Sequence, residues 1–192
     1  DLDIVDDNGN SVRGKNGYLV IKSPWPAMTR GLLNDNDRYI KTYWSKFENI
    51  WFHGDYVFAD EDNLWYMQGR SDDVINVSGH RMSTAEIEHT VISHKKISDA
   101  ASISIPDELT GEAIVVFFVS NDKNDIDLES EIMEHICKKI GKIAKPKQIF
   151  QLSDLPKTRT GKIMRRLLKA KLMGTELGDL SSLENPGVLD EI

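Results

Sequence analysis

The sequence predicts an α+β fold built in two successive parts, and three observations support this. Aromatic and β-branched segments separated by turn residues occupy roughly the first 70 residues. From Asp72 onward, amphipathic helical patterns alternate with short apolar strands. The length, 192 residues, suffices for one large domain or two small ones. The change of pattern therefore suggests two domains, residues 1–71 and 72–192.

The first part is expected to be β-rich, with one helix. Strands are predicted at residues 18–22, 51–59 and 64–68, which are rich in aromatic and β-branched side chains. Runs of Asp, Asn and Gly, which favour turns, separate these segments. A helix is predicted near Asn36 to Phe47. A β-rich arrangement follows for this part of the chain.

The second part mixes helices and strands. A short strand is predicted at residues 74–77, and then a helix that opens with Ser83 and Glu86 in a capping-box pattern. Strands follow at 100–105 and 113–119. A helix from Asp127 repeats apolar residues at four-residue spacing and stops at Gly141, with glutamates early and lysines late. A strand near 148–152 and a basic helix from Gly161 to about Leu172 complete it, and residues 174–192 show no periodicity.

The composition excludes several classes of protein. The net charge is −7, which argues against a general nucleic-acid binder, yet residues 157–171 carry seven Lys or Arg and no acid. Those residues form either a solvated helix face or a docking surface for a phosphorylated ligand; as a nucleic-acid surface they lack interleaved aromatics. The longest apolar runs are too short to cross a membrane. The single cysteine, Cys137, excludes an internal disulfide and suits a cytoplasmic protein.

Lys162 is the first candidate for chemistry. It follows a Thr160-Gly161 turn and precedes a basic amphipathic segment, a geometry that suits a lysine reaching toward negative charge. A Walker phosphate loop is rejected, because that motif needs glycine where Pro156 stands and Ser or Thr where Ile163 stands. What remains is an exposed ammonium group on a glycine turn.

Three further motifs precede it: Gly54-Asp55, the run from Gly69 to Asp73, and the run from Val77 to Arg81. A carboxylate such as that of Asp55 accepts hydrogen bonds from two hydroxyls at once. A glycine lets a ligand approach the backbone closely, and a guanidinium group matches phosphate oxygens. Each motif alone is weak, and each has an ordinary structural explanation as a turn or a surface ion pair.

Residues 155–166, taken with these three motifs in this order and spacing, resemble the C-terminal end of the AMP-forming acetyl-CoA synthetases of the acyl-adenylate-forming superfamily. The resemblance covers essentially the whole chain. The sub-family is indicated by Ser23-Pro24-Trp25-Pro26, the segment 38–44 and the ending 183–188. The resemblance implies that residues 1–71 are the β-rich end of a large N-terminal adenylate-forming domain. Residues 72–192 would be the small, mobile C-terminal α+β domain of a longer protein.

The resemblance also implies roles for individual residues. Lys162 would be the catalytic lysine, which binds carboxylate and adenylate oxygens during acyl-AMP formation. The nucleotide-binding residues would be Asp55 and Arg70 at the ribose and Arg81 at a phosphate. Ser78 and Gly79 would line the tunnel for the pantetheine arm of CoA, and Asp72 would be the hinge. One position departs from the pattern: Cys137 stands where an arginine contacts the CoA nucleotide, and Lys138 or Lys139 could substitute.

The activity implied is that of an AMP-forming acetate–CoA ligase, with ATP and CoA as co-substrates and Mg²⁺ ligands outside this chain. Propionate and 3-hydroxypropionate remain alternative acids. A non-catalytic nucleotide-binding or partner-binding module is the rival from another class. The resemblance also makes Lys162 a target for a lysine acetyltransferase and deacetylase. No nucleic acid and no membrane are expected as partners, and the isolated chain is expected to be inactive.

Overall fold

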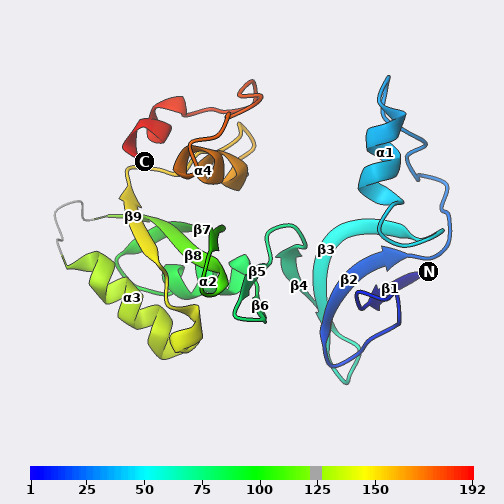
Figure 1. Ribbon diagram of the computed structural model, residues 1–192, viewed down its shortest axis with the longest axis horizontal. Helices are drawn as coiled ribbons and strands as arrows, with labels where there is room; N and C mark the ends of the chain where they lie inside the picture. Colours follow the sequence, from blue (N-terminus) through cyan, green and yellow to red (C-terminus); the bar gives the residue numbers. More distant parts are fainter. Residues whose placement is uncertain (122–126) are drawn as a thin grey trace. The chain divides into compact units, whose positions relative to one another are not determined.

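The computed structural model describes residues 1–121 and 127–192, which divide into two compact units. The N-terminal unit is Asp1–Asp72 and the C-terminal unit is Asp73–Ile192. Helices and strands occur in both, so the predicted α+β class is confirmed (Figure 1). Within the described residues, no helix combines the length and the apolar character needed to span a bilayer.

The N-terminal unit is a four-stranded antiparallel sheet with one helix. The strands are adjacent in chain order, β1 (Leu2–Val5), β2 (Asn16–Ile21), β3 (Trp51–Ala59) and β4 (Trp65–Arg70). Strand β1 was not predicted, because its four residues are too short for a periodic signal. Helix α1 (Asn36–Tyr43) ends before the predicted Phe47 and contacts β3. Its start is capped by Asp35, whose carboxylate accepts a hydrogen bond from the Arg38 amide.

The C-terminal unit is a five-stranded mixed sheet with helices on both faces. Its strands are β5 (Ile75–Val77), β6 (His80–Met82), β7 (Ile97–Asp107), β8 (Gly111–Ser120) and β9 (Gln148–Leu152). The order is β6-β5-β8-β7, and β9 pairs with β8 in parallel. The helices are α2 (Thr84–Ile92), α3 (Leu128–Lys139), α4 (Arg165–Leu172) and two 3₁₀ turns, η1 (Lys142–Ala144) and η2 (Pro186–Glu191).

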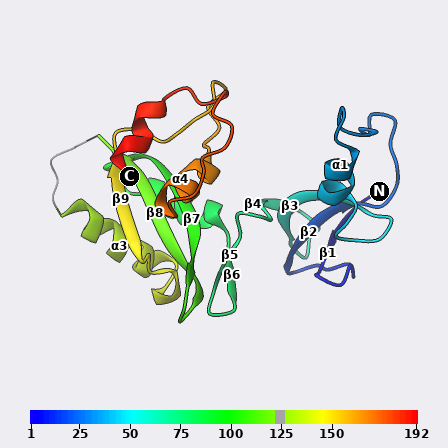
Figure 2. The same cartoon turned by 45° about the horizontal axis from the view of Figure 1, so that its top comes forward.

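Strand β8 organises this unit, because it is buried on both faces. Alternate side chains from Ile114 to Phe118 join α2 and α3 in one hydrophobic cluster. The residues between them, Val115 and Phe117, join a second cluster with α4 and the C-terminal segment. Figures 1 and 2 show these layers, with α2 and α3 against one face of the sheet and α4 with η2 against the other. The uninterrupted apolar run from Ala113 to Val119 is therefore the sequence of a doubly covered strand.

Three sequence-based expectations need correction. The basic helix begins at Arg165 rather than at Gly161, because the residues before it form a narrow loop. Strand β6 was missed, because three residues carry no periodic signal. The tail after Gly174 ends in η2 and buries Val188 and Leu189.

Candidate functional site

Lys162 lies in a closed loop, residues 155–164, here called the lysine loop. Lys157 and Ile163 form an antiparallel bridge across its base, and the Thr158 amide donates to the Lys162 carbonyl at 2.9 Å. The Gly161 amide donates to the Thr158 carbonyl at 2.8 Å, with glycine at φ 81°. A side chain other than glycine rarely adopts that angle. The turn predicted from Thr160-Gly161 is therefore present and fixed by its own hydrogen bonds.

Lys162 is exposed directly after the turn of this loop, opposite Thr158. Its backbone amide donates to the Thr158 hydroxyl at 3.1 Å. Its side chain forms no hydrogen bond or ion pair with any residue in the ranges 1–121 and 127–192. A fixed backbone that presents an unpaired ammonium group can bind an anionic ligand without first breaking an ion pair.

The helix after the loop is anchored by a pair of residues that the sequence did not single out. Arg165 donates from Nε and Nη2 to the two Glu88 carboxylate oxygens, at 2.8 and 2.7 Å. Glu88 is buried on α2, and its Oε1 also accepts from the Ser102 amide of β7 at 2.8 Å. Burial lowers the pKa of Arg165, but the hydrogen bonds to Glu88 outweigh it, and the pKa lies above its usual range.

Lys157, the first residue of the basic run 157–171, is half-buried and paired with carboxylates. Its ammonium group lies 2.8 Å from Asp99 Oδ2 and 2.9 Å from Asp154 Oδ1. The hydrogen bonds to Asp99 and then Asp154 raise the pKa of Lys157. The two neighbouring lysines of the loop therefore differ in role, since one is held by carboxylates and the other is open to solvent.

Ser78 and Gly79 form the two-residue turn between β5 and β6. Their φ angles are 51° and 82°, and Val77 pairs with His80 across the turn. Positive φ at both central residues defines the type I′ hairpin, which explains the glycine locally. A Cβ atom added at Gly79 would meet nothing within 4 Å, so the backbone faces open space. Arg81, on β6, is exposed beside this turn.

In the N-terminal unit, the structure brings Asp55, Arg70 and Asp72 together. Asp55 and Arg70 are cross-strand partners in β3 and β4, and Arg70 Nη1 lies 3.5 Å from Asp55 Oδ1. Arg70 Nε also donates to Asp72 Oδ1 at 3.2 Å. Gly54, at φ 91°, makes room, since a Cβ there would lie 2.7 Å from the Arg70 guanidinium. The expected nucleotide and hinge residues thus share one ion-pair chain.

His53 is a neighbour that the sequence analysis gave no role. Its Nε2 lies 3.1 Å from Asp55 Oδ2, so each carboxylate oxygen of Asp55 has one nitrogen partner. A carboxylate offers about four lone-pair positions, so acceptor capacity for a ligand remains. Beside this group lies a pocket of about 420 Å³, lined by Thr42, Tyr43, Trp51, Phe52, His53, Gly54, Arg70, Ser71 and Asp72.

Cys137, the residue at the expected arginine position, is half-buried on α3. It borders a pocket of about 510 Å³ together with Lys142 and Lys145, which come from η1 and the residue after it. These two lysines, neither of which the sequence analysis considered, bring positive charge to this pocket. The described residues contain no group of three or more His, Cys, Asp or Glu side chains that could hold a metal ion.

An exposed lysine on a closed loop and an exposed glycine hairpin occur here in one small mixed-sheet unit, and residues 86–162 match the AMP-binding enzyme C-terminal domain family. Residues 86–162 therefore belong to the AMP-binding enzyme C-terminal domain family, in agreement with the motif around Lys162. Curated proteins similar to this chain include acetyl-coenzyme A synthetases. That of Pyrobaculum arsenaticum is 46% identical over 196 residues, which cover 100% of this chain and 29% of the relative.

Two other relatives agree with this assignment. Acetyl-coenzyme A synthetase 1 of Candida albicans is 46% identical over 183 residues, which cover 92% of this chain and 27% of the relative. The solved structure of acetoacetyl-CoA synthetase from Streptomyces lividans matches with a TM-score of 0.86 and 26% identity, over 99% of this chain and 29% of that one. The chain spans just under a third of the length of the curated relatives it matches.

Proposed function

We propose that this chain is the C-terminal part of an AMP-forming acetate–CoA ligase. The observation that carries the proposal is the unpaired Lys162 ammonium group, held directly after the turn of a closed loop in a chain whose relatives include acetyl-coenzyme A synthetases. In the whole enzyme, an acetate oxygen attacks the α-phosphorus of ATP, and the bond to pyrophosphate breaks. The CoA sulfur then attacks the acetyl carbon of acetyl-AMP, AMP leaves, and the thiol proton passes to solvent.

In this proposal the two reactions use different residues. Lys162 binds the carboxylate and adenylate oxygens in the first, while Asp55 and Arg70 hold the ribose and Arg81 meets a phosphate. Rotation about Asp72 then brings the Ser78-Gly79 turn to the pantetheine arm of CoA. Support comes from the exposed positive charge of Lys162, the Asp55–Arg70 ion pair and the open space beside Gly79. Mg²⁺ would be bound by residues outside this chain.

The acid and the regulation also belong to the proposal. Acetate is proposed from the names of the relatives. Propionate and 3-hydroxypropionate remain competitors, because one methylene in an apolar pocket changes binding by only about 1 to 3 kcal/mol. Exposure of Lys162 makes it accessible to a lysine acetyltransferase and deacetylase, which would remove and restore its charge. We place the enzyme in the cytoplasm, in keeping with its single cysteine.

The full-length protein that contains this chain is expected to catalyse acetate-dependent exchange of pyrophosphate into ATP, and to form acetyl-CoA when CoA is added. The 192-residue chain alone is expected to do neither, because the phosphate, carboxylate and magnesium sites would lie elsewhere. Both proteins are assayed side by side with acetate, propionate and 3-hydroxypropionate. Nucleotide binding without exchange by the full-length protein would favour the non-catalytic module instead.

Gly79→Leu in the full-length enzyme is expected to abolish acetyl-CoA formation from supplied acetyl-AMP and CoA, while pyrophosphate exchange stays within about twofold. Leucine fills the open space beside the hairpin. Gly79→Ala is the matched control, because both residues share the strain of φ 82°, about 1 kcal/mol relative to glycine, but only leucine adds bulk. Equal loss of thioester formation in the two variants would show that strain, rather than a filled tunnel, is responsible.

A further inference from the structure

The last residues of the chain fasten the lysine loop. Residues 183–191, here called the C-terminal brace, run beside it, with Leu183 bridged to Thr158 and the Glu184 amide donating to the Lys157 carbonyl at 2.9 Å. Apolar side chains of the brace pack on the residues that flank the loop. Val188 joins the cluster of Leu155, and Leu189 joins that of Met164.

Asn185 is the centre of this contact. Its Oδ1 accepts from the Lys157 amide at 3.1 Å, and its Nδ2 donates to the Leu155 carbonyl at 2.8 Å and to Asp154 Oδ2 at 2.9 Å. One half-buried side chain thus satisfies two backbone groups of the loop and one carboxylate that orients Lys157. Backbone amide and carbonyl groups that are shielded from water need hydrogen-bond partners, so these hydrogen bonds restrict the path of the loop.

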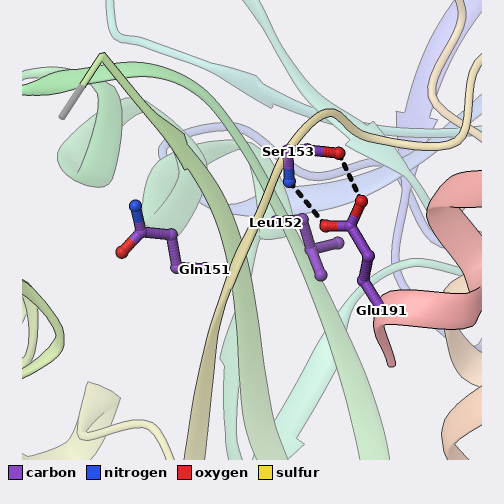
Figure 3. Close-up of a pocket in the computed structure, with 4 residues that line it drawn as sticks. All are labelled: Gln151, Leu152, Ser153 and Glu191. Atoms are coloured by element: carbon purple, nitrogen blue, oxygen red, sulfur yellow. Dashed lines mark hydrogen bonds between the residues drawn. The ribbon is translucent and has the colours of Figure 1, made fainter. Parts of the chain in front are cut away.

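A second fastening point lies at the end of the brace. The Glu191 carboxylate accepts from the Ser153 amide at 2.7 Å and also from the Ser153 hydroxyl. Figure 3 shows this pair, with the glutamate reaching from η2 to the end of β9, at the edge of a pocket of about 430 Å³. The brace is therefore held at both ends, and the entry to the lysine loop lies between them.

We infer that Asn185 is a positioning residue for the Lys162 loop, acting through the loop backbone rather than on substrate; the inference rests on the proposed function. The loop holds Lys162 by turn hydrogen bonds, and its entry is fixed by Asn185 from outside. A misplacement of a reacting group by about 1 Å can slow a reaction about a hundredfold. Loosening the loop is expected to slow the step that uses Lys162 and to leave the other step alone.

The first measurement is amide hydrogen exchange on the 192-residue chain, which needs no activity. Asn185→Ala is expected to speed exchange at Thr158, Gly161 and Met164 about tenfold, although none of these amides bonds to Asn185. Ser182→Ala, an exposed residue just outside the brace, is the control and should match the unaltered chain. Unchanged exchange at all three amides in Asn185→Ala would overturn the inference, whatever the protein catalyses.

The second measurement uses the full-length enzyme. Asn185→Ala should lower kcat for pyrophosphate exchange about tenfold, with KM for ATP unchanged, and leave thioester formation from acetyl-AMP within about twofold. Asn185→Asp keeps an acceptor for the Lys157 amide but has no donor for the Leu155 carbonyl, so its loss of kcat should be comparable to that of Asn185→Ala. Equal loss in both half-reactions would reduce Asn185 to a general stabilising residue. Absence of exchange in the unaltered enzyme would instead contradict the proposed function.

Discussion

Lys162→Ala in the full-length protein is expected to reduce acetyl-AMP formation about a thousandfold and to leave acetyl transfer from supplied acetyl-AMP to CoA nearly unchanged. A unit charge about 4 Å from developing negative charge, at an effective dielectric of about 20, contributes about 4 kcal/mol. That energy corresponds to about three powers of ten in rate. Since no described residue pairs with this ammonium group, its removal leaves no orphaned partner, and the loss reports the contact with substrate.

The measurement compares pyrophosphate exchange with single-turnover thioester formation in the same preparation. Lys157→Ala provides no clean control, because that lysine is paired with Asp99 and Asp154. Arg159→Ala does, since the residue is exposed on the same loop and carries the same charge. Enzyme homogeneously acetylated at Lys162 should behave like Lys162→Ala. Loss of both half-reactions to the same extent would argue against separate roles for Lys162 and the Ser78-Gly79 turn.

Glu88→Ala is expected to lower the free energy of unfolding of the C-terminal unit by about 3 kcal/mol, because it leaves a partly buried guanidinium group without its partner. It also removes the acceptor of the Ser102 amide. This loss of stability lies at the lower end of the range for buried ion pairs, because 26% of the Arg165 side chain is exposed to solvent. Glu86→Ala, on the exposed face of the same helix, should change stability by less than about 1 kcal/mol.

The choice of probe matters for this measurement. All four tryptophans lie before Asp72, so their fluorescence follows the N-terminal unit only. Amide exchange at β8 residues such as Val116 and Phe117, which are buried in the two clusters, reports on the C-terminal unit. Glu88→Leu combined with Arg165→Met should regain part of the loss, because apolar residues can replace a buried pair, although the Ser102 amide still lacks its acceptor. Destabilisation of the double variant beyond the single one would refute this account.

The parts of the fold that could be predicted have long-range regularity. Helix α3 repeats apolar residues from Leu128 to Ile140 at four-residue spacing, and β8 is an unbroken apolar run. Of the strands with four residues or fewer, β5 was predicted, whereas β1 and β6 were not. The hairpin of β5 and β6 requires positive φ angles at Ser78 and Gly79. The short sequence of the turn does not by itself determine these angles.

The candidate site divides in the same way. Lys162, Asp55 and Arg70 could be named because each stands in a short local motif. Glu88 and Asn185 could not, since their partners lie far along the chain: Glu88 contacts Arg165, 77 residues away, and Asn185 contacts Leu155, 30 residues away. Charged and amide side chains are common at exposed positions, so their sequence carries no sign that a tertiary contact has been formed.

The conformation of the lysine loop depends on the rest of the C-terminal unit as well as on the hydrogen bonds within the loop. Asp99 and Glu88 hold its flanks from β7 and α2, while residues 183–191 hold it from the end of the chain. A short peptide with the sequence of residues 155–166 would lack all of these supports. A modifying enzyme or antibody that recognises the folded surface around Lys162 therefore depends on a discontinuous site, which is formed by four separate segments of the chain.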